Sequence, residues 1–291
     1  MAGPLHILVT GASGFVGQAL VRMALAHGHA VTALVREGSA GPQGASLLHH
    51  ALGSGAGLAL PAGVDAVAHL AQSRVYRAFP ADAEEMFRVN VAGAHEVLRA
   101  AAAANVSRFC LVSSGTVYEP FSGSLDEDSA LAPSSNLGAT KLAAEVIARP
   151  YGAVFPVSIL RLFGPYGPGQ TARLVPDLIR RVREGAPVTL PETGGGMVFT
   201  PTYVDDVCET ILAAIVESWS GAFNVASPEA LSIEDAVKVI GKALRKAPVF
   251  ERKPGHAPVL APDVTKLGRC HDLTRFRSFA AGVEAMLAGE G

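Results

Sequence analysis

The sequence predicts an α/β fold, in which a doubly wound parallel sheet is followed by a smaller C-terminal domain interleaved with it. Three observations predict this fold. Short apolar segments alternate with helical ones over the first half, three glycines follow the first apolar segment, and the alternation stops at a Gly- and Pro-rich stretch, residues 164–169. Alternating strands and helices are typical of a parallel sheet that helices cover on both faces.

The strand candidates are short runs of apolar residues. They are residues 5–9, 30–35, 46–51, 66–70, 109–113 and 157–163. The helix candidates are residues 14–26, 83–104 and 138–148. The Ala-rich end of the second helix fits this assignment because alanine is the best helix former. Residues 38–63 are rich in Gly, Ala and Ser, and their weak periodicity leaves the boundaries of the elements there undefined.

The first strand candidate runs directly into a glycine-rich turn and then into a helix. Gly11, Gly14 and Gly17 let the backbone turn sharply and approach a ligand, while the free N–H groups and the dipole of the helix start attract phosphate. This order predicts a Rossmann-type site for the pyrophosphate of a nucleotide cofactor, and the alternative is a glycine-rich turn without a ligand. The residues expected to form the site are Gly11, Ser13, Gly14, Phe15, Val16 and Gly17.

The remainder of the chain has a different character. After residue 163 come further helices and short strands, with no second phosphate loop. We therefore predict a dinucleotide-binding domain over residues 1–163 and a smaller substrate-side domain over residues 164–291, with some exchange of chain between the two.

Composition and charge narrow the class of ligand. The chain has 291 residues, 49% hydrophobic and 17% charged, with a formal net charge of −2, which is typical of a compact globular protein. No basic block is longer than Arg180-Arg181, so we expect a small-molecule ligand and neither nucleic acid nor membrane as a partner. We see no membrane span or signal peptide and expect a cytoplasmic location. The spacing of His and Cys residues predicts no metal site.

The end of the second strand bears on the choice of cofactor. In NAD-binding proteins an acidic residue there usually accepts a hydrogen bond from the ribose 2′-hydroxyl, whereas an arginine accommodates a 2′-phosphate. Here Val35 stands at the expected position and Arg36 follows it. We therefore predict NADP. The alternative is NAD, with Arg36 as an ordinary solvated side chain.

Further motifs follow the glycine turn in a fixed order. They occupy residues 64–71, 88–93, 108–118, 141–145, 161–168, 203–207 and 223–225. Together they resemble, over nearly the whole chain, the extended short-chain dehydrogenase/reductase family, whose members include NAD(P)-dependent epimerases and dehydratases. Beyond the glycine turn and Arg36, the resemblance implies cofactor contacts from Leu70, Ala71, Gln72, Asn90, Lys141, Leu162 and Phe163. It also implies a homodimer formed by helix 83–104, the helix that begins at Gly138, and their copies.

The family resemblance also implies a reaction. A hydride passes between substrate and nicotinamide while a tyrosine exchanges the hydroxyl proton, helped by a lysine four residues later and by a Ser or Thr. Ser114 falls on the Ser/Thr position and Lys141 on the lysine position, but Leu137 occupies the tyrosine position. Leucine can neither donate nor accept a proton, so the chain is an atypical member with an altered acid/base group.

Two functions stay open on this basis. The first is an oxidoreductase or epimerase that acts on a hydroxyl or carbonyl group of a sugar-like or secondary-metabolite substrate. The second is a catalytically degenerate NAD(P)-binding regulatory or partner protein. Retention of Ser114 and Lys141 favours the enzyme, and Leu137 favours the binding protein.

Four positions are candidate substrate contacts. Gly115-Thr116 follow Ser114 where the family's sugar 4,6-dehydratases carry an Asp-Glu pair, which argues against that reaction, and Tyr76 lies in the loop after the fourth strand. Phe199 replaces an arginine that nucleotide-sugar enzymes use on the pyrophosphate, which favours a smaller or more apolar ligand. Lys253 matches a late arginine of the family and would meet a phosphate as a point charge.

Overall fold

The computed structural model describes residues 3–121 and 125–289. The chain divides into two compact units and passes back and forth between them. The first unit comprises residues up to 120, 127–162 and 208–223, and the second comprises residues 121–126, 163–207 and 224 onwards. The assignment of the cofactor to the first part of the chain and of the substrate to the later part stays a prediction.

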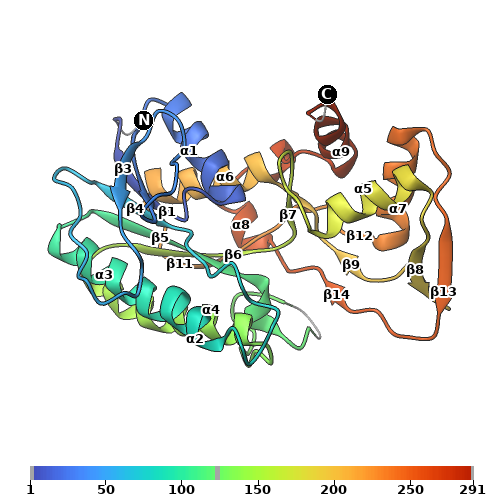
Figure 1. Ribbon diagram of the computed structural model, residues 1–291, viewed down its shortest axis with the longest axis horizontal. Coiled ribbons are helices and arrows are strands. Elements are labelled where there is room, and N and C mark those ends of the chain that lie inside the picture. Colours follow the sequence, from blue (N-terminus) through green and yellow to red (C-terminus); the bar gives the residue numbers. More distant parts are fainter. Residues whose placement is uncertain (1–2, 122–124, 290–291) are drawn as a thin grey trace. The chain divides into compact units, whose positions relative to one another are not determined.

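A seven-stranded sheet forms the centre of the first unit (Figure 1). Its strands are β1 (His6–Thr10), β2 (Ala30–Val35), β3 (Ser46–His49), β4 (Ala66–His69), β5 (Arg108–Ser114), β6 (Val157–Leu162) and β11 (Gly221–Val225), in the order β11-β6-β5-β4-β1-β2-β3. The pairs from β3 through β6 are parallel. The strand order reverses between β1 and β4, and the carboxyl ends of strands at such a switch point are where open α/β sheets bind ligands.

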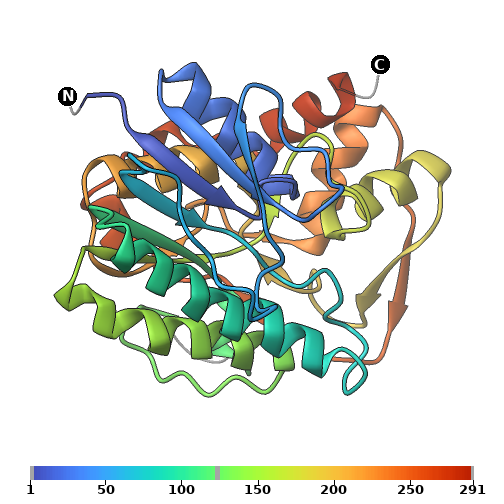
Figure 2. The same ribbon diagram turned by 60° about the vertical axis from the view of Figure 1, so that its left-hand side comes forward.

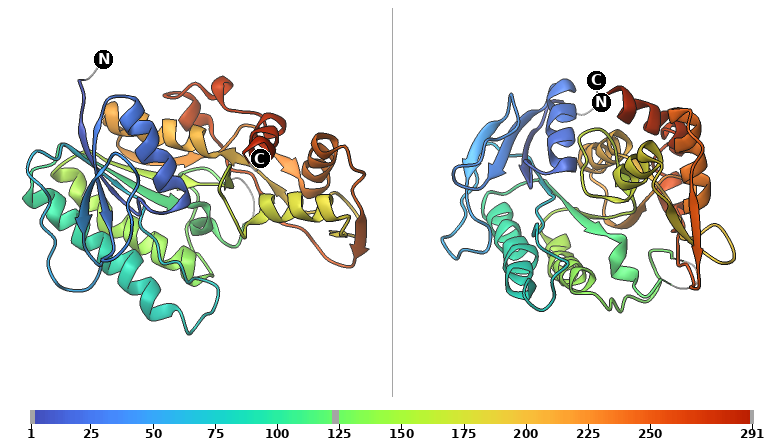
Figure 3. Two further views of the ribbon diagram at one scale, coloured as in Figure 1. Left: turned by 45° about the horizontal axis from the view of Figure 1, so that its top comes forward. Right: turned by 45° about the vertical axis from the view of Figure 1, so that its right-hand side comes forward.

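Helices cover both faces of this sheet. They are α1 (Phe15–Ala26) on one face and α2 (Ala83–Met86), α3 (Gly93–Ala103) and α4 (Asn136–Ala148) on the other (Figures 1 and 2). Figure 3 shows α3 and α4 side by side beneath the sheet. Helix α6 (Val204–Val216) lies beside α1 from Cys208 onwards, where the Cys208 thiol approaches the Val16 carbonyl at 3.7 Å. The predicted Rossmann-type α/β fold is therefore confirmed.

The predicted strands agree closely with the observed ones because the central strands are buried on both faces. Central strands such as β1 and β4 are buried on both faces, so they read as continuous apolar runs. The predicted strands and short helices of this unit are present, with ends displaced by at most two residues. The predicted helix 83–104 differs, because a π-helical segment, Phe87–Ala92, separates α2 from α3. Two 3₁₀ turns, Gly115–Tyr118 and Arg149–Ala153, flank α4 in sequence.

The second unit combines small sheets with amphipathic helices. Its strands are β7 (Pro165–Tyr166) with β10 (Thr202–Tyr203), β9 (Val198–Phe199) with β12 (Leu231–Ser232) and β14 (Val259–Leu260), and β8 (Val188–Pro191) with β13 (Phe250–Lys253). Its helices are α5 (Leu174–Glu184), α7 (Ile233–Leu244), α8 (Thr265–Gly268) and α9 (Phe279–Ala288), with a 3₁₀ turn at Leu273–Arg275. Among the helices of residues 3–121 and 125–289, none has the length and apolar character needed to cross a membrane.

Candidate active site

The glycine turn lies where β1 ends and α1 begins. Gly11 adopts a φ of +67°, and its carbonyl accepts a hydrogen bond of 2.9 Å from the Gly14 N–H. A Cβ on Gly17 would lie 2.2 Å from the Gly11 carbonyl oxygen, so α1 packs directly on the turn. Helix α1 has no side-chain cap at Gly14 and no acidic residue in its first turn. Its first N–H groups and the positive end of its dipole are therefore available to an anion.

The turn presents its backbone outward. Residues 13–16, which include the predicted ligands Ser13, Phe15 and Val16, are partly exposed, whereas Ala12 and Gly17 on either side are buried. The structure therefore brings together the glycine-turn residues that the sequence predicts as the pyrophosphate site, in a cradle that a side chain at Gly17 would close.

The end of β4 is tied to this turn through two residues that sequence analysis did not single out. The Thr10 hydroxyl lies 2.8 Å from Nδ1 of His69 and accepts a hydrogen bond of 3.2 Å from the Ala71 N–H. The Leu70 N–H donates to the Thr10 carbonyl at 3.2 Å. Burial, with a smaller contribution from the charge of Lys141, lowers the pKa of His69 to about 3, so this imidazole is neutral. Predicted cofactor residues Leu70 and Ala71 thus lie against the glycine turn.

Asn90 connects the segment after β4 to helix α4. It lies in the π-helical segment, where its side-chain oxygen accepts a hydrogen bond of 2.8 Å from the Ser73 N–H. Its amide nitrogen donates to the Thr140 hydroxyl at 3.0 Å. Gln72 directly precedes Ser73 and is partly exposed. π-Helical segments are frequent at functional sites, and here Asn90 ties the backbone directly after Gln72 to helix α4.

The predicted catalytic positions meet where β5 gives way to a 3₁₀ turn. The Ser114 hydroxyl accepts hydrogen bonds from the N–H (3.2 Å) and the hydroxyl (3.0 Å) of Thr116. Helix α4 starts against this turn, because a Cβ on Gly138 would lie 2.4 Å from the Thr116 carbonyl oxygen. Leu137, the residue before, is partly exposed in the first turn of α4. The structure therefore places Leu137, the residue predicted to stand at the tyrosine position, next to the serine turn.

Lys141 follows one turn later on α4. Its side chain is only 5% exposed, and its ammonium group donates a hydrogen bond of 3.0 Å to the Val112 carbonyl of β5. Burial lowers the pKa of Lys141 to about 8, although the charge of Glu145 acts in the opposite direction. The amine is therefore protonated below about pH 8 and neutral above it.

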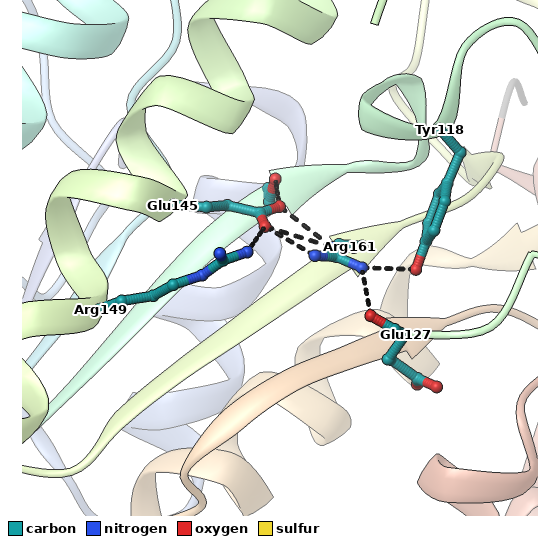
Figure 4. A network of polar contacts seen from close by, with 6 residues as sticks. Tyr118, Glu127, Glu145, Arg149 and Arg161 are labelled. Carbon is teal, nitrogen blue, oxygen red and sulfur yellow. Dashed lines mark hydrogen bonds and ion pairs between the residues drawn. The ribbon is translucent and has the colours of Figure 1, made fainter. Parts of the chain in front are cut away.

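A buried ion pair supports α4 from the opposite end (Figure 4). Glu145 and Arg161 are 0% and 1% exposed, and three hydrogen bonds join them, from Nε to Oε1 at 3.1 Å and to Oε2 at 3.3 Å and from Nη2 to Oε2 at 2.9 Å. The Ser113 hydroxyl also donates to Glu145, at 2.5 Å, and Arg149 approaches the same carboxylate at 3.5 Å. This network fixes the helix that carries Leu137 and Lys141 against β5 and β6.

Arg161 extends the network toward the 3₁₀ turn. It donates to the Tyr118 hydroxyl at 2.6 Å and to the Glu127 carbonyl at 3.3 Å, as Figure 4 shows. Burial alone would lower the pKa of Arg161, but the hydrogen bonds and charge of Glu145 outweigh burial and raise it. A charged residue inside an otherwise apolar strand, as in residues 159–162, is the sequence signal that predicts such a pair.

The remaining predicted residues lie in several places. Arg36 follows β2 and is exposed, and Leu162 ends β6. Tyr76 is partly exposed, with the Arg77 guanidinium 5.3 Å from its ring centroid.

Three other predicted residues belong to the second unit. Phe163 is buried, with its carbonyl accepting from the Thr202 hydroxyl, Phe199 packs edge-on against Phe279, and Lys253 lies exposed beside Glu251. The roles of these residues stay predictions.

A comparison with known proteins settles the family. Residues 7–226 match the NAD dependent epimerase/dehydratase family. The chain belongs to this family. The family prediction from the sequence motifs is thus confirmed, and with it the prediction of an NAD(P)-dependent enzyme of the epimerase/dehydratase type.

Several members of the epimerase/dehydratase family resemble the chain over nearly its whole length. The low-salt glycan biosynthesis protein Agl12 of Haloferax volcanii is 31% identical over 285 residues, which cover 90% of this chain and 91% of that protein. The dTDP-glucose 4,6-dehydratase of Streptomyces griseus is 30% identical, with 97% of this chain and 93% of the dehydratase covered.

Solved structures of the family have the same fold. MoeE5 in complex with UDP-glucuronic acid and NAD superposes with a TM-score of 0.83 at 27% identity, covering 99% of both chains. The UDP-glucose 4-epimerase of Thermus thermophilus in complex with NAD gives a TM-score of 0.79 at 25% identity, covering 98% of both chains. Both neighbours hold NAD, and MoeE5 also holds a nucleotide sugar.

Proposed function

We propose that the chain is an NADP-preferring oxidoreductase or epimerase that acts on a hydroxyl or carbonyl group of a sugar-like or secondary-metabolite substrate. The observation that carries the proposal is the pairing of an intact glycine cradle with Ser114 and a buried Lys141 on either side of position 137. A nucleotide sugar is the first substrate class to test, because MoeE5 holds UDP-glucuronic acid or UDP-glucose together with NAD.

The residues present fit a nicotinamide dinucleotide. The glycine turn would hold the pyrophosphate, since its helix start has no side-chain cap and a Cβ at Gly17 would collide with the turn. Arg36 would meet the 2′-phosphate, and Lys141 would hold the nicotinamide ribose. Leu70, Ala71, Gln72, Asn90, Leu162 and Phe163 are proposed as the further cofactor contacts. When bound, the nicotinamide supplies or accepts a hydride.

Ser114 is proposed to hold the reacting oxygen of the substrate. Its hydroxyl already accepts two hydrogen bonds from Thr116, which use its lone pairs, so its own hydrogen is the part left to donate. Thr116 thus fixes the direction of the Ser114 O–H bond. Tyr76, Phe199 and Lys253 are proposed as substrate contacts at the places described above.

The NADP preference gives a first prediction. We expect Arg36→Ala to weaken NADP(H) binding by about tenfold or more, because a charge-assisted contact to the 2′-phosphate is lost, and to spare NAD(H). Calorimetric titration with both cofactors measures the two affinities. Arg22→Ala, which removes another exposed arginine of the same unit, is the matched control and should change neither affinity. Equal affinity of the parent for NAD(H) and NADP(H) would contradict the preference.

A homodimer is proposed from the same helices that cover the sheet. Phe87 is 60% exposed in the π-helical segment, and Val146 is 53% exposed on α4. Pairing these helices with their copies would bury both side chains in a four-helix contact. We expect light scattering to give a mass near twice the 30.0 kDa of one chain, and a concentration-independent mass near 30.0 kDa would contradict the dimer.

The second candidate function is an NAD(P)-binding regulatory or partner protein, which Leu137 favours. A turnover screen separates the two. The purified chain is mixed with NADP⁺ or NAD⁺ and with UDP-glucuronic acid, UDP-glucose or a set of alcohols, or with NADPH or NADH and a set of carbonyl compounds, and the absorbance of reduced nicotinamide is followed. The enzyme hypothesis predicts hydride transfer with at least one of them. Cofactor binding without transfer to or from any of them favours the binding protein.

A further inference from the structure

The loss of the tyrosine leaves the reaction without its usual proton carrier, and helix α4 places an ionisable side chain, Lys141, one turn after position 137. The contact between Gly138 and the Thr116 carbonyl holds the start of α4 on the serine turn, so Leu137 occupies a fixed position. One helical turn on, Lys141 reaches β5 at the Val112 carbonyl, two residues before Ser114. An ionisable amine and the Ser114 hydroxyl therefore lie at the same end of one strand.

The Lys141 ammonium has hydrogens to spare. It carries three N–H bonds. Within residues 3–121 and 125–289, the Val112 carbonyl is the one hydrogen-bond acceptor found for them. The side chain is 5% exposed, so the remaining hydrogens are largely shielded from bulk water. A buried donor with unused hydrogens is suited to an acceptor that a ligand brings.

Among the charged neighbours of Lys141, Glu145 favours the ammonium form, but burial outweighs it. Glu145, on the same helix, shares its carboxylate among Arg161, Ser113 and Arg149, so its charge is already compensated. His69, which faces Lys141 from β4, is neutral and offers no negative charge. Lys141 thus has no carboxylate that pairs with it alone. Burial disfavours its charged ammonium form and lowers its pKa.

We propose that Lys141 itself exchanges the proton with the substrate oxygen, while Ser114 holds that oxygen. This inference rests on the proposed oxidoreductase function. In oxidation, the substrate O–H bond breaks and an N–H bond forms on the neutral amine, while the carbon loses a hydride to the oxidised nicotinamide and becomes a carbonyl. The alcohol is oxidised, the cofactor is reduced, and the lysine passes its added proton to water. Reduction reverses each step.

The first test follows the lysine directly and needs no turnover. Lys141 is the one lysine within the sequence of the first unit, and the other lysines, from Lys238 onwards, belong to the second. NMR of the full chain with ¹³C-labelled lysine side chains is expected to show one lysine that titrates near pH 8, well below the others. That signal should be missing in Lys141→Arg. If every lysine titrates near its ordinary pKa of about 10.4, the inference is overturned.

The second test measures hydride transfer against pH. UDP-glucuronic acid and UDP-glucose with NADP⁺ are the probes, and reduced nicotinamide is followed in a single turnover. The rate should rise about tenfold per pH unit up to about pH 8 and then level off, because only the neutral amine accepts a proton. Lys141→Arg keeps the positive charge but cannot release its proton, so the rate should fall by about 10²–10⁴-fold. Calorimetry shows whether this variant still binds NADP⁺.

The outcomes separate the inference from the function on which it rests. Transfer that Lys141→Arg leaves unchanged would overturn the role of Lys141 and keep the oxidoreductase function. NADP⁺ binding without hydride transfer in any arm of the turnover screen would overturn the oxidoreductase function, and the inference with it. If Lys141→Arg does not fold, Leu137→Tyr is the second variant, since it restores a phenol and leaves the lysine in place. The pH at which its rate levels off should move away from 8, and an unchanged profile would overturn the inference.

Discussion

Replacing Glu145 by glutamine is expected to lower the free energy of unfolding of the first unit by about 3–5 kcal/mol, the usual cost of breaking one side of a buried ion pair. The two side chains are almost completely buried, so the substitution leaves the Arg161 guanidinium charged and without its partner. Urea unfolding followed by the fluorescence of Trp219 measures this cost. Trp219 is the single tryptophan of the chain and lies in the first unit.

Arg149→Ala is the matched control for this experiment. Arg149 contacts the same carboxylate, but its side chain is 52% exposed and the distance is 3.5 Å. An exposed ion pair contributes about 0–1 kcal/mol, so the control should change stability little. Equal losses for Glu145→Gln and Arg149→Ala, or a loss below about 1 kcal/mol for Glu145→Gln, would show that the buried pair does not stabilise the unit as described.

Gly17→Ala is expected to weaken cofactor binding by roughly 5- to 150-fold. A Cβ at this position would lie 2.2 Å from the Gly11 carbonyl oxygen and 2.8 Å from the Ala12 Cα, both of them backbone atoms of the turn. Overpacking of this kind costs about 1–3 kcal/mol. If the bound form bears that cost, the affinity falls by the factor of roughly 5 to 150 given above. To make room for the Cβ, the turn must open, which displaces its N–H groups from the phosphate. Titration with NADP(H) measures the loss of affinity.

The same substitution at Gly152 is the control for Gly17→Ala. A Cβ at Gly152 meets nothing within 4 Å, and this glycine also belongs to the first unit. We expect Gly152→Ala to leave the affinity unchanged. Equal affinities of the parent and Gly17→Ala for NADP(H), in a folded variant, would contradict the glycine turn as the pyrophosphate site.

The sequence predicts the first unit well because its strands are buried on both faces. β1, β4 and β5 read as unbroken apolar runs, and the glycine turn after β1 has a local physical signature in sequence. The positions of Ser114, Leu137 and Lys141 follow from motif spacing, and the structure brings Ser114 and the start of α4 into contact through Thr116.

Features that depend on distant contacts are harder to predict. The π-helical segment arises where Asn90 bonds at once to Ser73 and Thr140, 17 and 50 residues away. Strand β11 joins the sheet beside β6 although about 60 residues separate the two strands, and its short apolar run does not identify its neighbour. The orientation of His69 depends on Thr10 in the same way. Periodicity reports which face of an element is buried, but it does not report the partner.

The central claim is that this family member transfers a hydride without a phenol at position 137. Incubating the parent chain with NADP⁺ and fully deuterated UDP-glucose, followed by mass spectrometry of the cofactor, tests it most directly. The account predicts reduced cofactor that carries one deuterium from the sugar. Bound cofactor that gains no deuterium, together with a Leu137→Tyr variant that does gain it, would contradict the account and identify the parent as a binding protein.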